Sequence, residues 1–360
     1  MLLLLALTSC NSTVCPRTTV KSAGECVPAV YDAPETESVR FDSGTGDFQL
    51  QGTLLLPVST HYDRLPPGVV LVHGSGPNTR DELSTGQLLM QFGKEVRMFE
   101  ELAQNLVDQG FAVLRYDKRT CYHSQQGCEN DYPTPDADSI SYWHFRDDAD
   151  AAVSYLAGRG DIDPLDVVVM GHSQGGQIVP FVQHEAATDI VLLAGPYRPV
   201  DQLLEYQAAK TVDVLTVLGY NDADIDVSTA DLDDWVLQLG QIRAGNHDGA
   251  SFGNTPASFW TEWLDAGDQT PDAVTSWPHG VLVLNGDYDW NVPPTEATMF
   301  DLQLAAHPDA EVQILPELTH PFLRVSQPQW QQITEADIGD GVDASLTDAL
   351  IPWLRRAPIE

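Results

Sequence analysis

Short runs of consecutive apolar residues recur along this chain, and each has the length of a buried strand. Three of them span residues 68–72, 167–170 and 281–284, and residues 312–315, Val-Gln-Ile-Leu, form a fourth run that one polar residue interrupts. A parallel strand that is covered on both faces shows such a continuous run, whereas a half-exposed strand alternates apolar and polar residues. Residues 176–185 have a composition compatible with a helix. The pattern therefore predicts an α/β fold, in which helices flank a mostly parallel central sheet.

The stretch over residues 198–280 is too long for a simple helical crossover between two strands. Apolar residues recur within it at helical spacing, as at Leu203, Leu204, Leu232, Trp235 and Leu239. We expect these residues to form a mainly helical cap, inserted after the sixth strand of a core made of residues 39–197 and 281–358. The length of 360 residues fits one large domain with an insertion.

The amino terminus reads as an export signal. Residues 2–7 are apolar, but the run is too short to span a membrane. It ends in Leu-Thr-Ser-Cys, which resembles the bacterial lipobox. By this resemblance residues 1–9 are a lipoprotein-type signal peptide, Cys10 is the lipidated residue, and residues 10–38 are a tether rich in Ser, Thr and Pro. The positive charge that usually precedes such a run is missing, which leaves open whether Met1 is the true start.

The most specific motif of the chain follows the apolar run at 167–170. Residues 171–175 read Gly-His-Ser-Gln-Gly, the G-x-S-x-G pattern of a nucleophile elbow. Such a turn between a strand and a helix holds the serine in a strained backbone conformation at the top of a parallel sheet. Side chains two residues before and after the serine would collide with the flanking elements, which explains both glycines. The motif predicts that Ser173 is a nucleophile.

Three further loops follow apolar runs in the order that the elbow requires. Residues 73–77, His-Gly-Ser-Gly-Pro, come after the run at 68–72. Residues 286–293, Gly-Asp-Tyr-Asp-Trp-Asn-Val-Pro, come after the run at 281–284 and contain Asp289. His320 follows the last apolar run. The chain order serine, aspartate, histidine differs from the orders in chymotrypsin and subtilisin.

Through these motifs the chain resembles the alpha/beta hydrolase superfamily over about residues 39–358. The resemblance implies a catalytic triad of Ser173, His320 and Asp289. It also implies an oxyanion hole made by the backbone N–H groups of Ser75 and Gln174.

A narrower resemblance is to secreted bacterial esterases of the dienelactone-hydrolase-like and serine aminopeptidase-like branch. It rests on residues 73–77 with Arg-Asp-Glu at 80–82, on Leu-Arg-Tyr-Asp-Lys-Arg at 114–119, and on Leu-Ala-Gly-Pro at 193–196. One departure is visible, because Thr120 stands where the family usually has a glycine after Asp-Lys-Arg.

Several neighbouring residues compete for the same roles. Asp287 lies in the same loop as Asp289, but the spacing from Gly286 favours Asp289 as the triad acid. His172 is adjacent to the nucleophile, yet adjacent side chains on a sharp turn point apart, so we expect it to pack or to hydrogen-bond nearby. His73 and Gly74 are expected to support the oxyanion loop rather than to transfer protons.

The cysteines divide into one lipidation site and two local pairs. If Cys10 carries lipid, Cys15 with Cys26 and Cys121 with Cys128 form an even remainder for disulfides in an oxidising compartment. Free thiols are the alternative reading of these four residues.

The large negative net charge of the chain disfavours two classes of binding partner. The chain has 53 acidic and 18 basic residues, a formal net charge of −35, which disfavours binding to nucleic acid and to anionic membrane surfaces. We expect membrane contact only through a lipid on Cys10, and a location in the bacterial cell envelope, periplasmic or at the cell surface, or outside the cell. The sequence leaves the oligomeric state open.

Carboxylic ester hydrolysis is the function that these motifs favour, with a small-molecule ester as substrate and with no metal or organic cofactor. A peptidase or aminopeptidase on the same triad is the nearest alternative, because the two reactions share acyl-transfer chemistry and differ in their pockets. A catalytically inactive binding module on the same fold is the second alternative.

Overall fold

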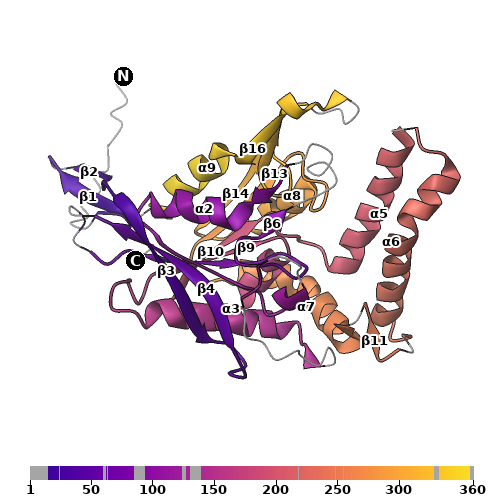
Figure 1. Ribbon diagram of the computed structural model, residues 1–360, viewed down its shortest axis with the longest axis horizontal. Coiled ribbons are helices and arrows are strands. Elements are labelled where there is room, and N and C mark those ends of the chain that lie inside the picture. The colour runs from indigo at the N-terminus through magenta and orange to yellow at the C-terminus, as the bar shows by residue number, and fades with distance from the viewer. Residues whose placement is uncertain are drawn as a thin grey trace, which may run out of the picture.

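A computed structural model describes most of the chain in three dimensions (Figure 1). The described residues are 15–23, 25–59, 62, 64–84, 94–123, 127–129, 139–217, 219–247, 249–253, 255–327 and 332–356. The predicted signal peptide and Cys10 lie outside these residues. None of the described helices combines the length and the apolar character that are needed to cross a membrane.

Eight strands form the central sheet. Their spatial order is β14 (Ala310–Leu315), β13 (Val281–Gly286), β10 (Ala187–Leu193), β9 (Val167–His172), β5 (Gly68–Val72), β8 (Ala112–Tyr116), β4 (Gln49–Val58) and β3 (Asp32–Asp42). All neighbouring pairs from β14 to β8 are parallel, whereas β4 is antiparallel to both β8 and β3. The predicted α/β class with a mostly parallel sheet is confirmed.

The continuous apolar runs arise because both faces of the sheet are covered. In β5, Val70 and Val72 belong to one apolar cluster, whereas Val69 and Leu71 belong to the cluster on the opposite face. Helices α2 (Met98–Val107) and α9 (Ala344–Leu354) cover the second face, and α3 (Trp143–Ala157) and α8 (Pro294–Gln303) cover the first, as Figure 1 shows for α2, α9 and α3. No strand position in β5 can therefore be polar without an internal partner.

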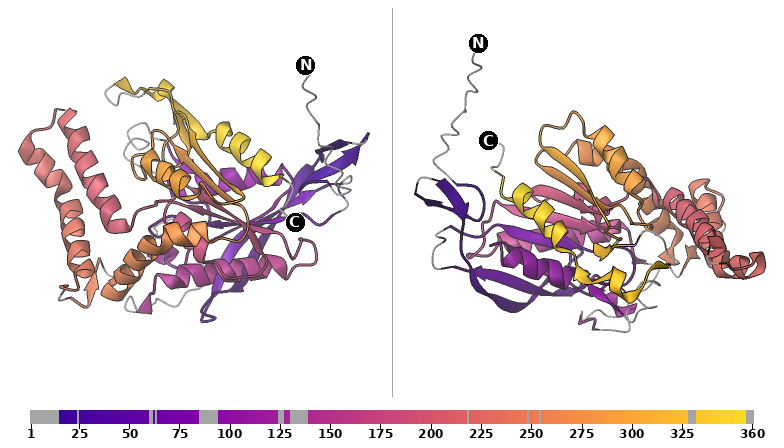
Figure 2. Two further views of the ribbon diagram at one scale, coloured as in Figure 1. Left: turned by 180° about the vertical axis from the view of Figure 1, so that it is seen from behind. Right: turned by 90° about the horizontal axis from the view of Figure 1, so that it is seen from above.

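Residues 198–280 are mainly helical in the structure. They contain α5 (Val200–Val217), α6 (Asp222–Arg243) and α7 (Ala257–Thr275), with a small antiparallel pair, β11 (Ser251–Phe252) and β12 (Thr255–Pro256), between the last two. Helices α5 and α6 project from the body as a pair, whereas α7 lies against it (Figures 1 and 2). At the start of α6 the side chain of Asn221 accepts a hydrogen bond from the backbone N–H of Asp224, which caps the helix.

Three more strand pairs and several short turns complete the described chain. The antiparallel pairs are β1 (Thr19–Ser22) with β2 (Glu25–Pro28), β6 (Leu83–Ser84) with β7 (Val96–Arg97), and β15 (Leu323–Val325) with β16 (Ile338–Val342). The short 3₁₀ turns are η1 (Cys121–His123), η3 (Val179–Phe181) and η5 (Glu335–Asp337).

The prediction of a tether through residue 38 is wrong for the described part of that segment. Residues from Thr19 form β1, β2 and the start of β3, and β3 pairs with β4 along the edge of the central sheet. The Arg17 guanidinium is buried and donates hydrogen bonds to Asp166 at 2.6 Å and to Asp189 at 2.6 Å. These contacts fasten the segment to the body, so its polar composition reflects an exposed edge strand rather than a mobile chain.

The helix expected at 176–185 is shorter than predicted and begins earlier. Helix α4 (Gln174–Ile178) starts directly after the elbow and tightens into η3. Pro180 lies within η3, and a proline ring removes a backbone donor and clashes with the carbonyl four residues earlier. The α-helix therefore stops before Pro180, and the 3₁₀ turn that follows ends at Phe181.

Candidate active site

Ser173 lies on the turn between β9 and α4 in a strained conformation, with φ 54° and ψ −120°. Its backbone N–H donates to Leu193 O at 2.9 Å, which ties the turn to β10. A Cβ at Gly171 would overlap the Gly175 carbonyl, and a Cβ at Gly175 would overlap the Val72 carbonyl. The two glycines therefore allow the close backbone approach that keeps the serine in this conformation.

His320 lies between the cleft that Ser173 lines and the buried carboxylate of Asp289. Its Nδ1 is 2.7 Å from Asp289 Oδ2. The other oxygen of Asp289 accepts the backbone N–H groups of Asn291 at 2.9 Å and Val292 at 2.8 Å, which fixes the carboxylate in the loop after β13. His320 and Ser173 line the same cleft. The structure thus brings together the serine, the histidine and the aspartate that the sequence predicts.

Asp287 serves a different purpose in the same loop. Its Oδ1 accepts the backbone N–H of Glu317 at 2.5 Å, so it holds the loop that leads to His320. Asp289 is 2 % exposed and faces the imidazole, whereas Asp287 is exposed to solvent. The geometry agrees with the choice of Asp289 over its neighbour.

The residues predicted for the oxyanion hole also line the cleft. Ser75 follows β5, and Gln174 is the first residue of α4, where backbone N–H groups have no partner within the helix. His73 lies behind them, buried between the rings of Phe99 and Tyr116 at centroid distances of 5.3 and 5.1 Å. Burial lowers the pKa of His73 to about 4, so this imidazole is neutral and acts by packing.

His172 joins two loops through its two ring nitrogens. Its Nδ1 is 3.0 Å from Glu82 Oε1, and its Nε2 is 3.1 Å from the backbone carbonyl of His320. A carbonyl and a carboxylate only accept hydrogen bonds, so both ring nitrogens must carry protons. Burial alone would lower the pKa of His172, but the charge and hydrogen bond of Glu82 outweigh it and raise the pKa. His172 is therefore the cationic half of a buried ion pair.

Glu82 and Lys118 are site residues to which the sequence analysis gave no role. Glu82 accepts the backbone N–H of Gly74 at 2.7 Å, and Lys118 Nζ lies 2.6 Å from Gly74 O. Both were present in the motifs that carry the family resemblance, but only the folded chain reveals that they meet at one glycine. The available signal was a lysine two residues after the apolar strand β8, and Glu82 has no comparable local signal.

The cleft has a volume of about 810 Å³ and an aromatic wall. Its wall is built from α5, α6 and α7, whose contributions include Leu203, Trp235, Phe259, Trp260 and Trp263. The ring of Trp263 stacks on that of Trp260 at 5.5 Å, and its Nε1 donates to Gln177 Oε1 at 3.0 Å. These aromatic residues thus form core contacts and line the cleft at the same time.

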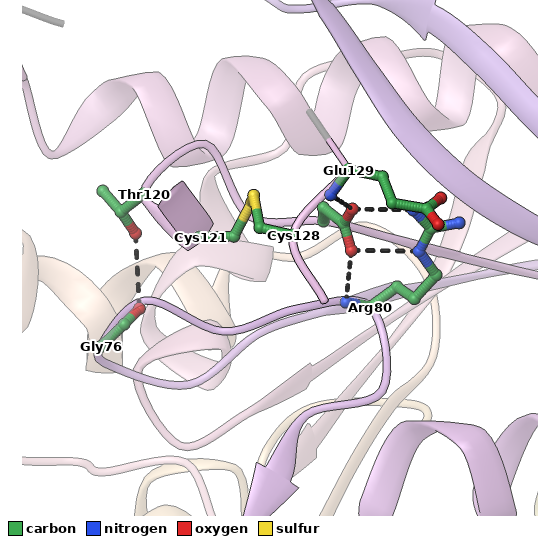
Figure 3. Close-up of a disulfide and its surroundings, with 7 residues drawn as sticks. Gly76, Arg80, Thr120, Cys121, Cys128 and Glu129 are labelled. Carbon is green, nitrogen blue, oxygen red and sulfur yellow. Dashed lines mark hydrogen bonds and ion pairs between the residues drawn. A yellow bond between two sulfur atoms is a disulfide. The ribbon is translucent and has the colours of Figure 1, made fainter. Parts of the chain in front are cut away.

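The loop after β8 borders the cleft mouth and contains a disulfide (Figure 3). Cys121 is joined to Cys128, and Cys15 to Cys26, with a Cα–Cα distance of 5.5 Å in each pair. These are the two pairs that the sequence predicts. Thr120, in place of the family's glycine, donates to Gly76 O at 3.4 Å and so contacts the loop that carries Ser75.

One cluster of metal-ligating atoms occurs among the described residues, and it does not suit a metal ion. It consists of Asp117, Cys121 and Cys128. The two sulfur atoms are bonded to each other, and Asp117 accepts hydrogen bonds from Arg80, with one of them at 2.7 Å. Thiolate ligands are therefore missing from this cluster.

Comparison with known proteins gives the chain its family. The sequence pattern of the serine aminopeptidase S33 hydrolases matches residues 88–325. The chain belongs to this family. The matched region of this S33 hydrolase contains Ser173, Asp289 and His320, and the predicted membership of the alpha/beta hydrolase superfamily is confirmed.

Individual relatives of this S33 hydrolase include named esterases. Esterase EstD of Thermotoga maritima is 34 % identical over 142 residues, which are 39 % of this chain and 30 % of EstD. The match thus spans less than a third of the length of EstD.

Two solved structures share the fold. The alpha/beta hydrolase GrgF from Penicillium sp. sh18 has a TM-score of 0.52 at 12 % identity, covering 89 % of this chain and 98 % of its own. The esterase domain of a Rhodothermus marinus protein has a TM-score of 0.50 at 16 % identity, with the same two coverages.

The His172–Glu82 pair makes stability depend on pH. Burial alone would raise the pKa of Glu82, but His172 and the Gly74 N–H stabilise the carboxylate and lower the pKa below its usual range. The contribution of Glu82 to the free energy of unfolding is therefore lost as the pH falls through that lowered pKa. The pKa of His172 is raised, so its contribution is complete below about 6.5 and is lost as the pH rises through the raised value.

We therefore expect His172→Gln to lower the free energy of unfolding by about 3 kcal/mol near pH ~5.5, where one partner of a buried pair is removed, and by less near pH ~9. Urea unfolding of both proteins at the two pH values measures this difference. An equal loss of unfolding free energy at both pH values would contradict a charged His172–Glu82 pair.

Proposed function

We propose that this chain is a serine hydrolase that cleaves carboxylic esters through an acyl-enzyme intermediate. The observation that carries the proposal is the 2.7 Å contact between His320 Nδ1 and buried Asp289, beside a strained elbow serine in the same cleft. The esterase names of its relatives support the same chemistry.

In the proposed reaction Ser173 Oγ attacks the acyl carbon while His320 Nε2 takes the hydroxyl proton. Asp289 accepts the Nδ1–H of His320, which selects the tautomer whose Nε2 is free to act as a base, and it stabilises the imidazolium that forms. The N–H groups of Ser75 and Gln174 receive the negative oxygen. His320 then returns the proton to the leaving alcohol, and water releases the acyl group by the same steps.

The cleft supports an ester substrate over the substrate of an aminopeptidase. An aminopeptidase must bind a free ammonium group, and a carboxylate is the partner that best stabilises an ammonium taken out of water. Among the described residues that line the cleft, Glu82 is the one carboxylate; Gly74 N–H and His172 occupy its Oε1, and its Oε2 is buried away from the cleft surface. A neutral substrate therefore suits this lining better than a cationic amino terminus.

An inactive binding module is the less favoured alternative. A binding module gains nothing from a positive φ at Ser173, a conformation that costs roughly 1–3 kcal/mol. A histidine aligned on a buried carboxylate is likewise unnecessary for binding an apolar ligand. The retention of both features supports catalysis.

The first test uses Ser173→Ala. We expect the wild type to hydrolyse p-nitrophenyl esters and to be much slower on aminoacyl-anilides, and we expect the variant to lose ester hydrolysis while keeping its thermal stability, since only a hydroxyl is removed. A fluorophosphonate probe should label Ser173 in the wild type alone. Labelling that persists in the variant would place the nucleophile elsewhere, and a preference for anilides would favour the peptidase.

The second test compares the two neighbouring acids. Asp289→Asn should lower kcat by about 10⁴, because the amide favours the wrong His320 tautomer. Asp287→Asn is the matched control, and it should have a small effect because its amide oxygen still accepts the Glu317 N–H. Steady-state kinetics of both variants on one ester decide the assignment, and a reversal of severity would make Asp289 the wrong choice.

We further propose that the protein is anchored in the cell envelope through a lipid on Cys10. The lipobox-like sequence before Cys10 and the two disulfides support this location. Expression in bacteria with radiolabelled palmitate should label the wild type, and Cys10→Ser should remain unlabelled and unanchored. A wild-type protein that takes up no label would refute the anchor.

A further inference from the structure

Lys118 occupies an unusual position for a lysine, directly beneath the predicted oxyanion hole. It follows β8 and is 4 % exposed. Its Nζ donates hydrogen bonds to Gly74 O at 2.6 Å and to Gln174 Oε1 at 2.8 Å. Gly74 lies in the loop after β5, whereas Gln174 is the first residue of α4, after β9. A single ammonium group therefore joins the two segments that supply the oxyanion donors.

The contact with Gly74 acts on the peptide group that carries the first donor. The carbonyl of Gly74 and the N–H of Ser75 belong to one planar peptide unit, so a hydrogen bond to the oxygen fixes the direction of the N–H. A positive charge at the oxygen also polarises the unit and makes its N–H a stronger donor. Lys118 can therefore strengthen a hydrogen bond to the substrate oxygen without touching the substrate.

The other side of Gly74 is fixed as well. Glu82 Oε1 accepts the Gly74 N–H at 2.7 Å, and a Cβ at Gly74 would lie 2.8 Å from that oxygen. An anion thus holds the His73–Gly74 peptide unit through its N–H, and a cation holds the Gly74–Ser75 unit through its C=O, which leaves both units little freedom to rotate.

The contact with Gln174 reaches the second donor. Gln174 is 3 % exposed, and its side chain accepts the hydrogen bond from Lys118 while its own backbone N–H opens the α4 helix. Holding the side chain limits the movement of this first helical residue relative to the Ser75 loop.

Burial disfavours the charged form of Lys118. Burial lowers the pKa of Lys118 to about 7, although the charge of Glu82 acts in the opposite direction. The Phe145 ring lies 4.4 Å from Nζ and offsets a part of this cost. A methionine or leucine would fill the same space without desolvating a charge, so packing alone does not explain a lysine at this position.

We propose that Lys118 is a positioning residue for the oxyanion hole, one that orients and polarises the Gly74–Ser75 peptide unit and couples it to Gln174. This inference rests on the proposed serine hydrolase function. Negative charge develops on the substrate oxygen when Ser173 Oγ bonds to the acyl carbon, the C=O π electrons move to oxygen, and the hydroxyl proton passes to His320. Lys118 therefore favours the transition state over the bound ester.

The test compares Lys118→Met with Lys94→Met. Lys94 also donates to backbone carbonyls, those of Ile338 at 2.9 Å and Gly339 at 3.2 Å, but it lies outside the cleft. We expect Lys118→Met to lower kcat by about 10- to 100-fold, somewhat less than the loss of a direct donor, with KM changed by less than about threefold. Lys94→Met should keep the wild-type kcat.

Inhibitors separate positioning from a general structural effect. A trifluoromethyl ketone adds to Ser173 and forms an oxyanion, whereas the corresponding ether analogue binds without one. In Lys118→Met the affinity for the ketone should fall by the same factor as kcat/KM, and the affinity for the ether should stay unchanged. A kcat within about twofold of the wild type, or an equal loss of affinity for both inhibitors, would overturn the proposal.

Two further measurements keep the outcome decisive. If Lys118→Met does not fold, Gln174→Ala removes one arm of the link and keeps the backbone N–H. A several-fold fall in kcat with a matching fall in ketone affinity then supports the proposal, and wild-type values overturn it. Fluorophosphonate labelling of wild-type Ser173 is measured in parallel. A wild type that is neither labelled nor active refutes the proposed function itself, whereas a labelled, active wild type with unaffected variants refutes only the role of Lys118.

Discussion

The candidate site depends on how closely three stretches of backbone approach one another at the elbow. Glycines at 171 and 175 remove the side chains that would overlap neighbouring carbonyls, and a Cβ at Gly176 would lie 2.6 Å from the Gly195 Cα. Without this contact β9 could not turn sharply into α4 between β5 and β10. The positive φ of Ser173, the exposure of its hydroxyl and the position of the Gln174 N–H all follow from that turn.

Beneath the elbow lies a layer of buried ionic groups that the apolar sheet alone would not require. Glu82, His172 and Lys118 are each less than 8 % exposed, and each contacts a backbone atom of the site. Their partners are the N–H of Gly74, the carbonyl of His320 and the carbonyl of Gly74. Side chains thus position backbone groups here, which lets loops that are far apart in the sequence keep fixed relative positions.

The parallel sheet and the candidate site residues both have local signatures in the sequence. Continuous apolar runs mark β5, β9 and β13, and Ser75, Ser173 and Asp289 lie in the segments that follow them, whereas His320 comes after the more polar strand β14. Partners that depend on tertiary contact could not be predicted. Arg17 fastens the amino-terminal segment to the body because Asp166 and Asp189 lie near it in the fold. Glu82 and Lys118 reach the site only when β5, β8 and β9 are neighbours in the sheet.

The docking of the amino-terminal segment also fixes where this segment lies relative to the cleft. Arg17 binds Asp166 and Asp189 near the amino ends of β9 and β10, whereas the cleft opens at the carboxyl ends of these strands. Figure 2 shows the β1–β2 hairpin and the α5–α6 pair at opposite ends of the molecule. A chain held at Cys10 would therefore turn its cleft away from the lipid surface. With the anchor and the ester substrate that we propose, substrates would reach the cleft from the surrounding solution rather than from within the bilayer.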